Sequence, residues 1–125
     1  MSSSFRDLRV WRDAMRLACE VYRGTASFPK HELYGLTQQI RRAAVSVPSN
    51  VAEGKGRYSD REFAHFLFNA RGSLLELQTQ LILAEELEYL SVAETRRLLA
   101  LAEGVGRGLS GLINSLRGLP RADAA

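Results

Sequence analysis

Residues 59–89 read SDREFAHFLFNARGSLLELQTQLILAEELEY, and their apolar side chains recur at intervals of three and four positions. Ser59, followed three residues later by Glu62, forms a capping box, in which each side chain satisfies a free amide at a helix start. The apolar stripe behind it consists of Phe63, Leu67, Ala70, Leu74, Leu77, Leu81 and Ala84. This period predicts an amphipathic helix over residues 60–89, roughly 45 Å long at about 1.5 Å per residue.

The N-terminal segment has the same period and predicts a helix over residues 5–26. Its apolar stripe consists of Leu8, Trp11, Met15, Ala18 and Tyr22. The segment Phe28-Pro29-Lys30 ends this helix, because proline disfavours helical backbone in the residue before it. We therefore expect Trp11 and Tyr22 to lie in the core.

A second helix is predicted over residues 33–55, and Gly54-Lys-Gly56 ends it. Its apolar stripe consists of Leu33, Leu36, Ile40, Ala43, Val47 and Val51. Pro48 lies inside this pattern and lacks the N–H that would bond the carbonyl of Ala44. We expect a kink at Pro48 and not the end of the helix.

A final helix is predicted over residues 92–117, with a second capping box at Ser91 and Glu94. Its apolar stripe consists of Leu98, Leu101, Val105, Leu109, Leu112 and Leu116. Gly118-Leu-Pro120 ends the helix, and the tail over residues 118–125 is expected to fray.

Four amphipathic helices joined by short connections must lie antiparallel to their neighbours, so the sequence predicts an all-α, up-down-up-down four-helix bundle. The length of 125 residues fits a single domain over residues 1–125. The N-terminus lacks the apolar stretch of a signal peptide, and no run of about 18 apolar residues exists to span a membrane. We expect a cytoplasmic protein.

The third helix carries more apolar surface than one bundle needs. Phe68, Leu75 and Ile82, spaced by seven residues, form a second stripe about 110° around the helix from the first. Such a stripe, if exposed in a monomer, would be an unusually large apolar patch. Either a neighbouring helix of the bundle covers it or it is a subunit interface, and we favour the interface.

The helix-two run YGLTQQIRRAAVSVPSNVAEG (residues 34–54) resembles the hallmark of the four-helix-bundle proteins encoded in intervening sequences of bacterial 23S rRNA genes. The opening FRDLRVW (residues 5–11) is similar to that family's opening, and GSLLELQTQL (residues 72–81) is similar to its third helix. The segment AEELEYLS (residues 84–91) resembles its turn into the fourth helix.

The resemblance implies an antiparallel four-helix bundle that assembles into a homopentameric barrel, with no established enzymatic activity and no cofactor. That family is similar to the accessory variability determinant of diversity-generating retroelements, a basic pentameric barrel that associates with nucleic acid and with a reverse transcriptase. The resemblance therefore bears on the fold and assembly more strongly than on the function.

The net charge of +3 is unevenly spread, since residues 1–61 carry 11 basic and 6 acidic side chains and residues 62–90 carry one Arg against five Glu. Arg9, Arg12, Arg16 and Arg23 lie within about 60° of one another on the first helix, and we call them the arginine row. Such a row can follow a phosphate backbone. Asp13 and Glu20, four residues after Arg9 and Arg16, can instead hold two of these arginines in surface pairs.

Arg41 and Arg42 have no acidic residue four positions away, which makes them better candidates for nucleic-acid contact. Beside them runs a polar stripe that consists of Gln39, Arg42, Ser46, Ser49, Asn50 and Glu53. It is either a recognition groove or a structural feature. In the structural reading, which we favour, Ser46 and Asn50 satisfy backbone groups freed by Pro48, and Arg42 or a neighbouring subunit pairs with Glu53.

No group of residues points to an enzyme or a metal site. His31 and His65 lack the second His or Cys that zinc needs, and Cys19 has no obvious base, so a buried structural thiol is expected. The run GRGLSG (residues 106–111) matches G-x-G-x-x-G, but that pattern binds dinucleotides only between a strand and a helix start. Its glycines, with Gly104, instead suggest close helix approach or a locally weak helix.

The sequence thus favours a non-enzymatic, homo-oligomeric helical-bundle protein that binds RNA or another nucleic acid through its arginine-rich surfaces. The alternative is an adaptor or scaffold that binds a protein partner, such as a reverse transcriptase or a ribosome-associated protein, without contacting nucleic acid directly.

Overall fold

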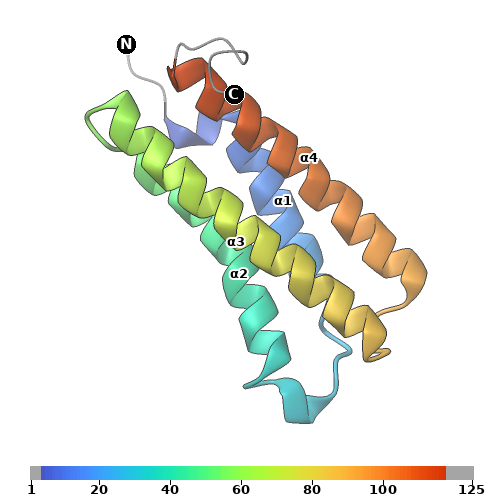
Figure 1. Cartoon of the computed structure of the whole chain (residues 1–125). Coiled ribbons are helices and arrows are strands. Elements are labelled where there is room, and N and C mark those ends of the chain that lie inside the picture. Colours follow the sequence, from blue (N-terminus) through green and yellow to red (C-terminus); the bar gives the residue numbers. More distant parts are fainter. Residues whose placement is uncertain (1–3, 118–125) are drawn as a thin grey trace.

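The computed structural model describes residues 4–117 and contains four long α-helices, with no β-strand in that range. They are α1 (Arg9–Gly24), α2 (Leu36–Lys55), α3 (Asp60–Glu86) and α4 (Val92–Arg117). Two short 3-10 helices, η1 (Phe5–Asp7) and η2 (Lys30–Glu32), precede α1 and α2. Each helix packs on two others: α1 and α3 both contact α2 and α4 (Figure 1). The predicted frayed tail, residues 118–125, lies outside the described residues.

The predicted helix over residues 5–26 is interrupted at its start. Ser4 and Asp7 form a capping box around η1, and Leu8 is extended, with φ −76° and ψ 123°, before α1 begins. The helix predicted from residue 33 begins later, at Leu36, because the Glu32 carboxylate accepts the free Leu36 N–H at 3.1 Å. As predicted, α2 continues through Pro48.

The turn from α3 into α4 is a Schellman motif. Glu88 N–H donates to the Glu85 carbonyl at 2.9 Å, and Tyr89 N–H donates to the Ala84 carbonyl at 2.9 Å. Glu88 has a φ of 63°, the left-handed region in which glycine is favoured. The helix predicted to reach residue 89 therefore ends at Glu86. Ser59 and Ser91 accept the amides three residues on, so the serine half of each predicted capping box is confirmed.

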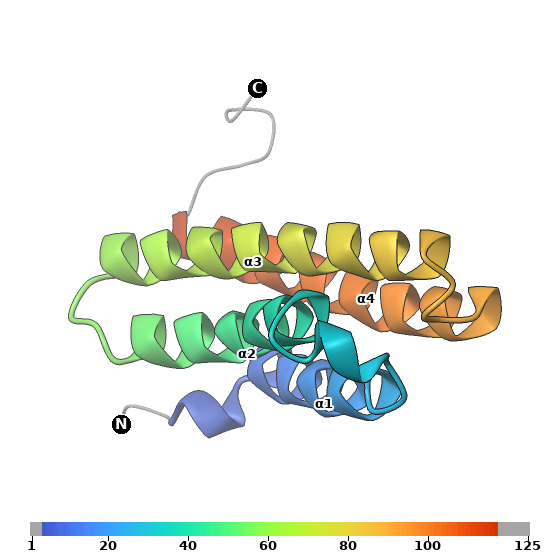
Figure 2. The ribbon, with the colours of Figure 1, turned by 90° about the horizontal axis from the view of Figure 1, so that it is seen from below.

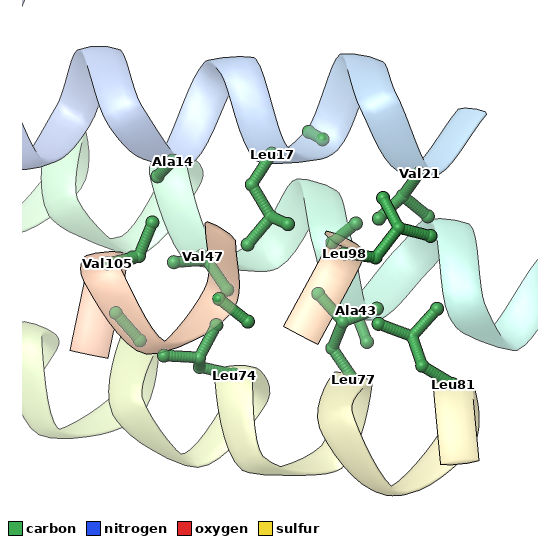
Figure 3. Close-up of a cluster of buried hydrophobic side chains, with 14 of the residues drawn as sticks. Ala14, Leu17, Val21, Ala43, Val47, Leu74, Leu77, Leu81, Leu98 and Val105 are labelled. Atoms are coloured by element: carbon green, nitrogen blue, oxygen red, sulfur yellow. The ribbon is translucent and has the colours of Figure 1, made fainter. Parts of the chain in front are cut away.

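All four helices contribute to one core, shown in Figure 3. On α3 every predicted apolar position is buried. On α2 the predicted stripe is buried except for Leu33, which precedes the helix and is exposed. On α4 the stripe also lies toward the core, with Leu98, Val105 and Leu109 buried and Leu101 partly buried.

The stripe predicted for the first helix is only partly correct: Ala18 is buried, and Leu8 and Trp11 are partly buried against the core, but Met15 and Tyr22 are exposed. The structure buries the neighbouring stripe, which consists of Val10, Ala14, Leu17, Ala18 and Val21. Met15 and Tyr22 are 39% and 44% exposed, and Trp11 is only partly buried. Ala14 has a small side chain, so α1 can lie close to its neighbours. The larger side chains of Trp11, Met15 and Tyr22 lie on the adjacent face of the helix, at the edge of the core. Cys19, predicted to be buried, is exposed.

Two glycines permit close helix contacts. A Cβ atom on Gly54 would lie 2.7 Å from Phe66 Cβ, so the end of α2 meets the start of α3 through glycine. A Cβ on Gly108 would lie 3.0 Å from Val10 Cγ2, where α4 meets α1. The predicted close approach in the glycine-rich part of α4 is thus confirmed at Gly108, and α4 is continuous through it.

Candidate functional site

The arginine row lies along the solvent side of α1. Arg9 pairs with Asp13 at 3.7 Å, as predicted, and both side chains are at least half exposed. Arg23 Nη1 lies 2.6 Å from Glu20 Oε2. Arg12 Nη1 donates to the Arg6 carbonyl at 3.1 Å. Arg16 is exposed and has no hydrogen bond or ion pair within the described part of the chain. Arg12 and Arg16 therefore have no carboxylate partner there and can meet an anionic ligand.

The predicted pair between Arg16 and Glu20 is wrong, because other arginines occupy this carboxylate. Arg97 of α4 donates to Glu20 at 2.7 Å and to Glu94 at 2.8 Å, and Arg23 binds the second oxygen of Glu20. Hydrogen bonds from Arg97 and then Arg23 lower the pKa of Glu20, and the Arg97 hydrogen bond lowers the pKa of Glu94. This cluster holds α1 against α4.

Arg41 and Arg42 are adjacent in sequence but serve different surfaces. Arg41 Nε donates to Thr25 Oγ1 at 2.9 Å, and its guanidinium lies 4.6 Å from the centre of the Tyr22 ring. Arg41 is thus tied to the end of α1. Arg42 is exposed and borders a hollow between α2 and α3. The structure does not bring Arg42 together with the arginine row.

The polar stripe on α2 is used within the protomer. Ser46 Oγ lies 2.9 Å from Ser73 Oγ of α3, and Asn50 Nδ2 donates to the Ser46 carbonyl at 2.8 Å. Glu53 pairs with Arg57 at 2.9 Å, so the predicted pairing with Arg42 is wrong. Ser46 and Asn50 thus make contacts within the protomer, but these bonds do not involve the Ala44 carbonyl that Pro48 frees, so the predicted role beside Pro48 is not shown.

A groove runs between α1 and α2 and has a volume of about 570 Å³. We call it the α1/α2 groove. Trp11, Met15 and Tyr22 form one wall, and Val45 of α2 stands on the other side, 42% exposed. Cys19 and Arg23 also line it. The apolar residues that sequence reasoning placed in the core thus form a surface feature.

The second stripe of α3 is only partly exposed. Leu75 and Ile82 are 59% and 49% exposed, and Leu83 beside them is 46% exposed. Phe68 instead packs against the core, and the Arg71 guanidinium lies 5.0 Å from its ring centre. We call Leu75, Ile82 and Leu83 the α3 ridge. Neighbouring helices of the bundle leave this ridge open to solvent.

The family model of the 23S rRNA-intervening sequence protein matches residues 6–111. The chain belongs to this family. The match runs through α1, α2 and α3 and covers most of α4, so the resemblance inferred from the sequence motifs is confirmed. Among curated proteins, none matches this chain.

Within the described residues, no group of three or more His, Cys, Asp or Glu side chains could hold a metal ion. Over the same range, none of the helices has the length and apolar character needed to cross a membrane. The arginine row, the α1/α2 groove and the α3 ridge are exposed surface features of the described residues. The sequence did not lead us to predict the groove. A signal for it was present, because α1 carries apolar residues on two adjacent faces of its helical wheel.

Proposed function

We propose that this member of the 23S rRNA-intervening sequence protein family is a non-enzymatic protein that binds RNA or another nucleic acid through the arginine row of α1. In this proposal the helices form an antiparallel up-down-up-down bundle in a bacterial, cytoplasmic protein. The bundle assembles as a homo-oligomer, with the pentamer implied by the resemblance as the expected state.

The observation that carries the proposal is the position of Arg12 and Arg16. Both side chains are exposed on one side of α1 and have no carboxylate partner in the described chain. The exposed Arg9 belongs to the same row, and its guanidinium lies 3.7 Å from the Asp13 carboxylate. Guanidinium groups bind phosphate in a two-pronged geometry, and each phosphate contact releases counterions. An oligomer would repeat the row in every subunit, so weak contacts would add up through multivalency.

Fluorescence anisotropy with a labelled RNA stem-loop at 50 and 200 mM salt tests the proposal. The slope of log K against log salt is negative, and the double variant R12Q/R16Q is expected to reduce its magnitude by about 1.4 to 1.8, because two phosphate contacts are lost. The matched control R61Q/R96Q removes the same charge from exposed positions on α3 and α4. No binding by the wild type at 50 mM salt and micromolar protein, or equal effects of the two double variants, would contradict the proposal.

The alternative function is a protein-binding adaptor, which the exposed α1/α2 groove and α3 ridge favour. In that case the arginines are ordinary surface residues. A pull-down from a nuclease-treated lysate separates the two functions. A protein partner that is retained after nuclease treatment, together with absent RNA binding, would favour the adaptor.

A further inference from the structure

We propose that the α3 ridge of one copy seats in the α1/α2 groove of the next copy, in a head-to-tail contact. This inference rests on the self-association in the proposed function and adds the two surfaces that make it. The occupant of the groove is thus a second copy of this chain. Three observations support it.

The two surfaces match in chemistry and spacing. Both are apolar: the groove exposes Met15 and Tyr22, and the ridge exposes Leu75 and Ile82. Each pair is separated by seven residues, which is roughly 10 Å along a helix at about 1.5 Å per residue. Side chains on a ridge with this repeat can fill a groove with the same repeat.

Their charges are opposite. The rim of the groove carries Arg23, which is paired with Glu20, and the rest of the arginine row continues beside it on α1, including Arg12 and Arg16, which have no carboxylate partner among the described residues. The ridge is flanked by the exposed side chains of Glu76 and Glu86, and Arg71, whose guanidinium lies over the Phe68 ring, stands at its N-terminal end beside Leu75. Complementary charges around an apolar contact favour association and set its orientation.

The two surfaces lie on different sides of the protomer. Figure 2 shows α3 on the side of the bundle opposite α1. A contact between two different surfaces is heterologous, and its repetition produces a closed ring or an open filament, whereas a twofold dimer requires one surface to meet itself. This contact involves Arg23 and leaves Arg12 and Arg16 outside the groove lining, available to the proposed nucleic acid.

Cys19, the only cysteine of the chain, lines the groove and provides a direct test. A second cysteine is placed on the ridge by Ile82→Cys, and the protein is treated with a short bismaleimide cross-linker. A head-to-tail contact predicts a ladder of covalent multimers, because each subunit then carries one thiol on each surface. The matched control is Val92→Cys on α4, another apolar position that is 51% exposed, and it is expected to give no ladder.

The wild type and one further variant, C19S/I82C, identify the surfaces. Wild-type Cys19 alone and C19S/I82C alone are each expected to give no cross-link, whereas a mixture of the two is expected to give covalent dimers. Dimers from Cys19 alone would indicate groove against groove, and dimers from C19S/I82C alone would indicate ridge against ridge. Either result would overturn the proposal.

Light scattering separates failure of this interface from failure of self-association. Ile82→Glu is expected to convert the oligomer at tens of micromolar into a species near the 13.9 kDa of one chain, and Val92→Glu is expected to leave the mass unchanged. An oligomeric Ile82→Glu variant would overturn this interface alone. A wild-type mass near 13.9 kDa would overturn both this interface and the proposed oligomer. The anisotropy measurement tests RNA binding independently.

Discussion

The Tyr89 hydroxyl donates a 2.9 Å hydrogen bond to Glu32 Oε2, joining two turns that lie 57 positions apart in the chain. The other carboxylate oxygen of Glu32 accepts the Leu36 N–H at the start of α2. These hydrogen bonds, from Leu36 first and then Tyr89, lower the pKa of Glu32, and the same contact raises the pKa of Tyr89. One carboxylate therefore caps α2 and fastens it to the turn between α3 and α4.

The Glu32 contacts predict a loss of stability in acid. The folded-state pKa of Glu32 lies below its ordinary value of 4.5, so the contribution is fully present above pH 4.5 and is lost as the pH falls through the lowered pKa. Glu32→Gln is expected to unfold more easily than wild type at pH 7 and to differ less at low pH. Urea unfolding of both proteins at pH 7 and pH 3 measures this. A difference that does not change with pH would contradict it.

Gly54→Ala is expected to destabilise the protein by about 1–3 kcal/mol, because the added Cβ would overlap Phe66 Cβ and Phe63 Cδ1, at 2.7 and 2.9 Å. The matched control is Gly72→Ala, in the exposed middle of α3, where a Cβ would meet nothing within 4 Å. The control is expected to stabilise by about 0.5–1 kcal/mol, because alanine favours helix over glycine. Thermal and urea unfolding of both variants check the opposite signs.

Glu88→Gly is expected to stabilise the protein by up to about 1 kcal/mol, because Glu88 occupies the left-handed position of the Schellman motif with a φ of 63°. Glu86→Gly, two residues earlier and still inside α3, is expected to destabilise by a similar amount. Chemical denaturation of the pair measures both changes. Equal destabilisation by both glycines would show that the backbone of Glu88 carries no strain.

Arg41→Gln and Arg42→Gln remove the same charge from adjacent positions and are expected to differ. Arg41→Gln loses the hydrogen bond to Thr25 and the contact with the Tyr22 ring, at an expected cost of about 1 kcal/mol. Arg42 is exposed, and its replacement is expected to change the free energy of unfolding by less than about 0.5 kcal/mol. Denaturant titration of the two single variants distinguishes them.

The sequence was sufficient to predict the buried face of α3 but not the buried face of α1. On α3 the stripe from Phe63 to Ala84 stood out, because polar residues separate it from most of its surroundings. On α1 two apolar stripes stand side by side, and periodicity alone does not rank them. The larger side chains of Trp11 and Tyr22 favoured the wrong one. The buried stripe is instead the one that contains Ala14 and Leu17, which allows the closer approach of neighbouring helices.

The candidate site was predictable only where a contact is local in sequence. The pair of Arg9 with Asp13 follows from a spacing of four residues. The pairing of Glu20 with Arg97 joins residues 77 positions apart and depends on how α1 meets α4. The difference between Arg41 and Arg42 depends on where the end of α1 lies beside α2. Neither is encoded in the spacing of charges along one helix.

Trp11 is the only tryptophan of the chain, and its indole ring forms part of the wall of the α1/α2 groove. Indole emission moves to shorter wavelengths when water leaves the surroundings of the ring. The molecule therefore carries an intrinsic optical probe at the groove, and a dilution series followed by its unlabelled fluorescence would report when the groove is filled and when it empties.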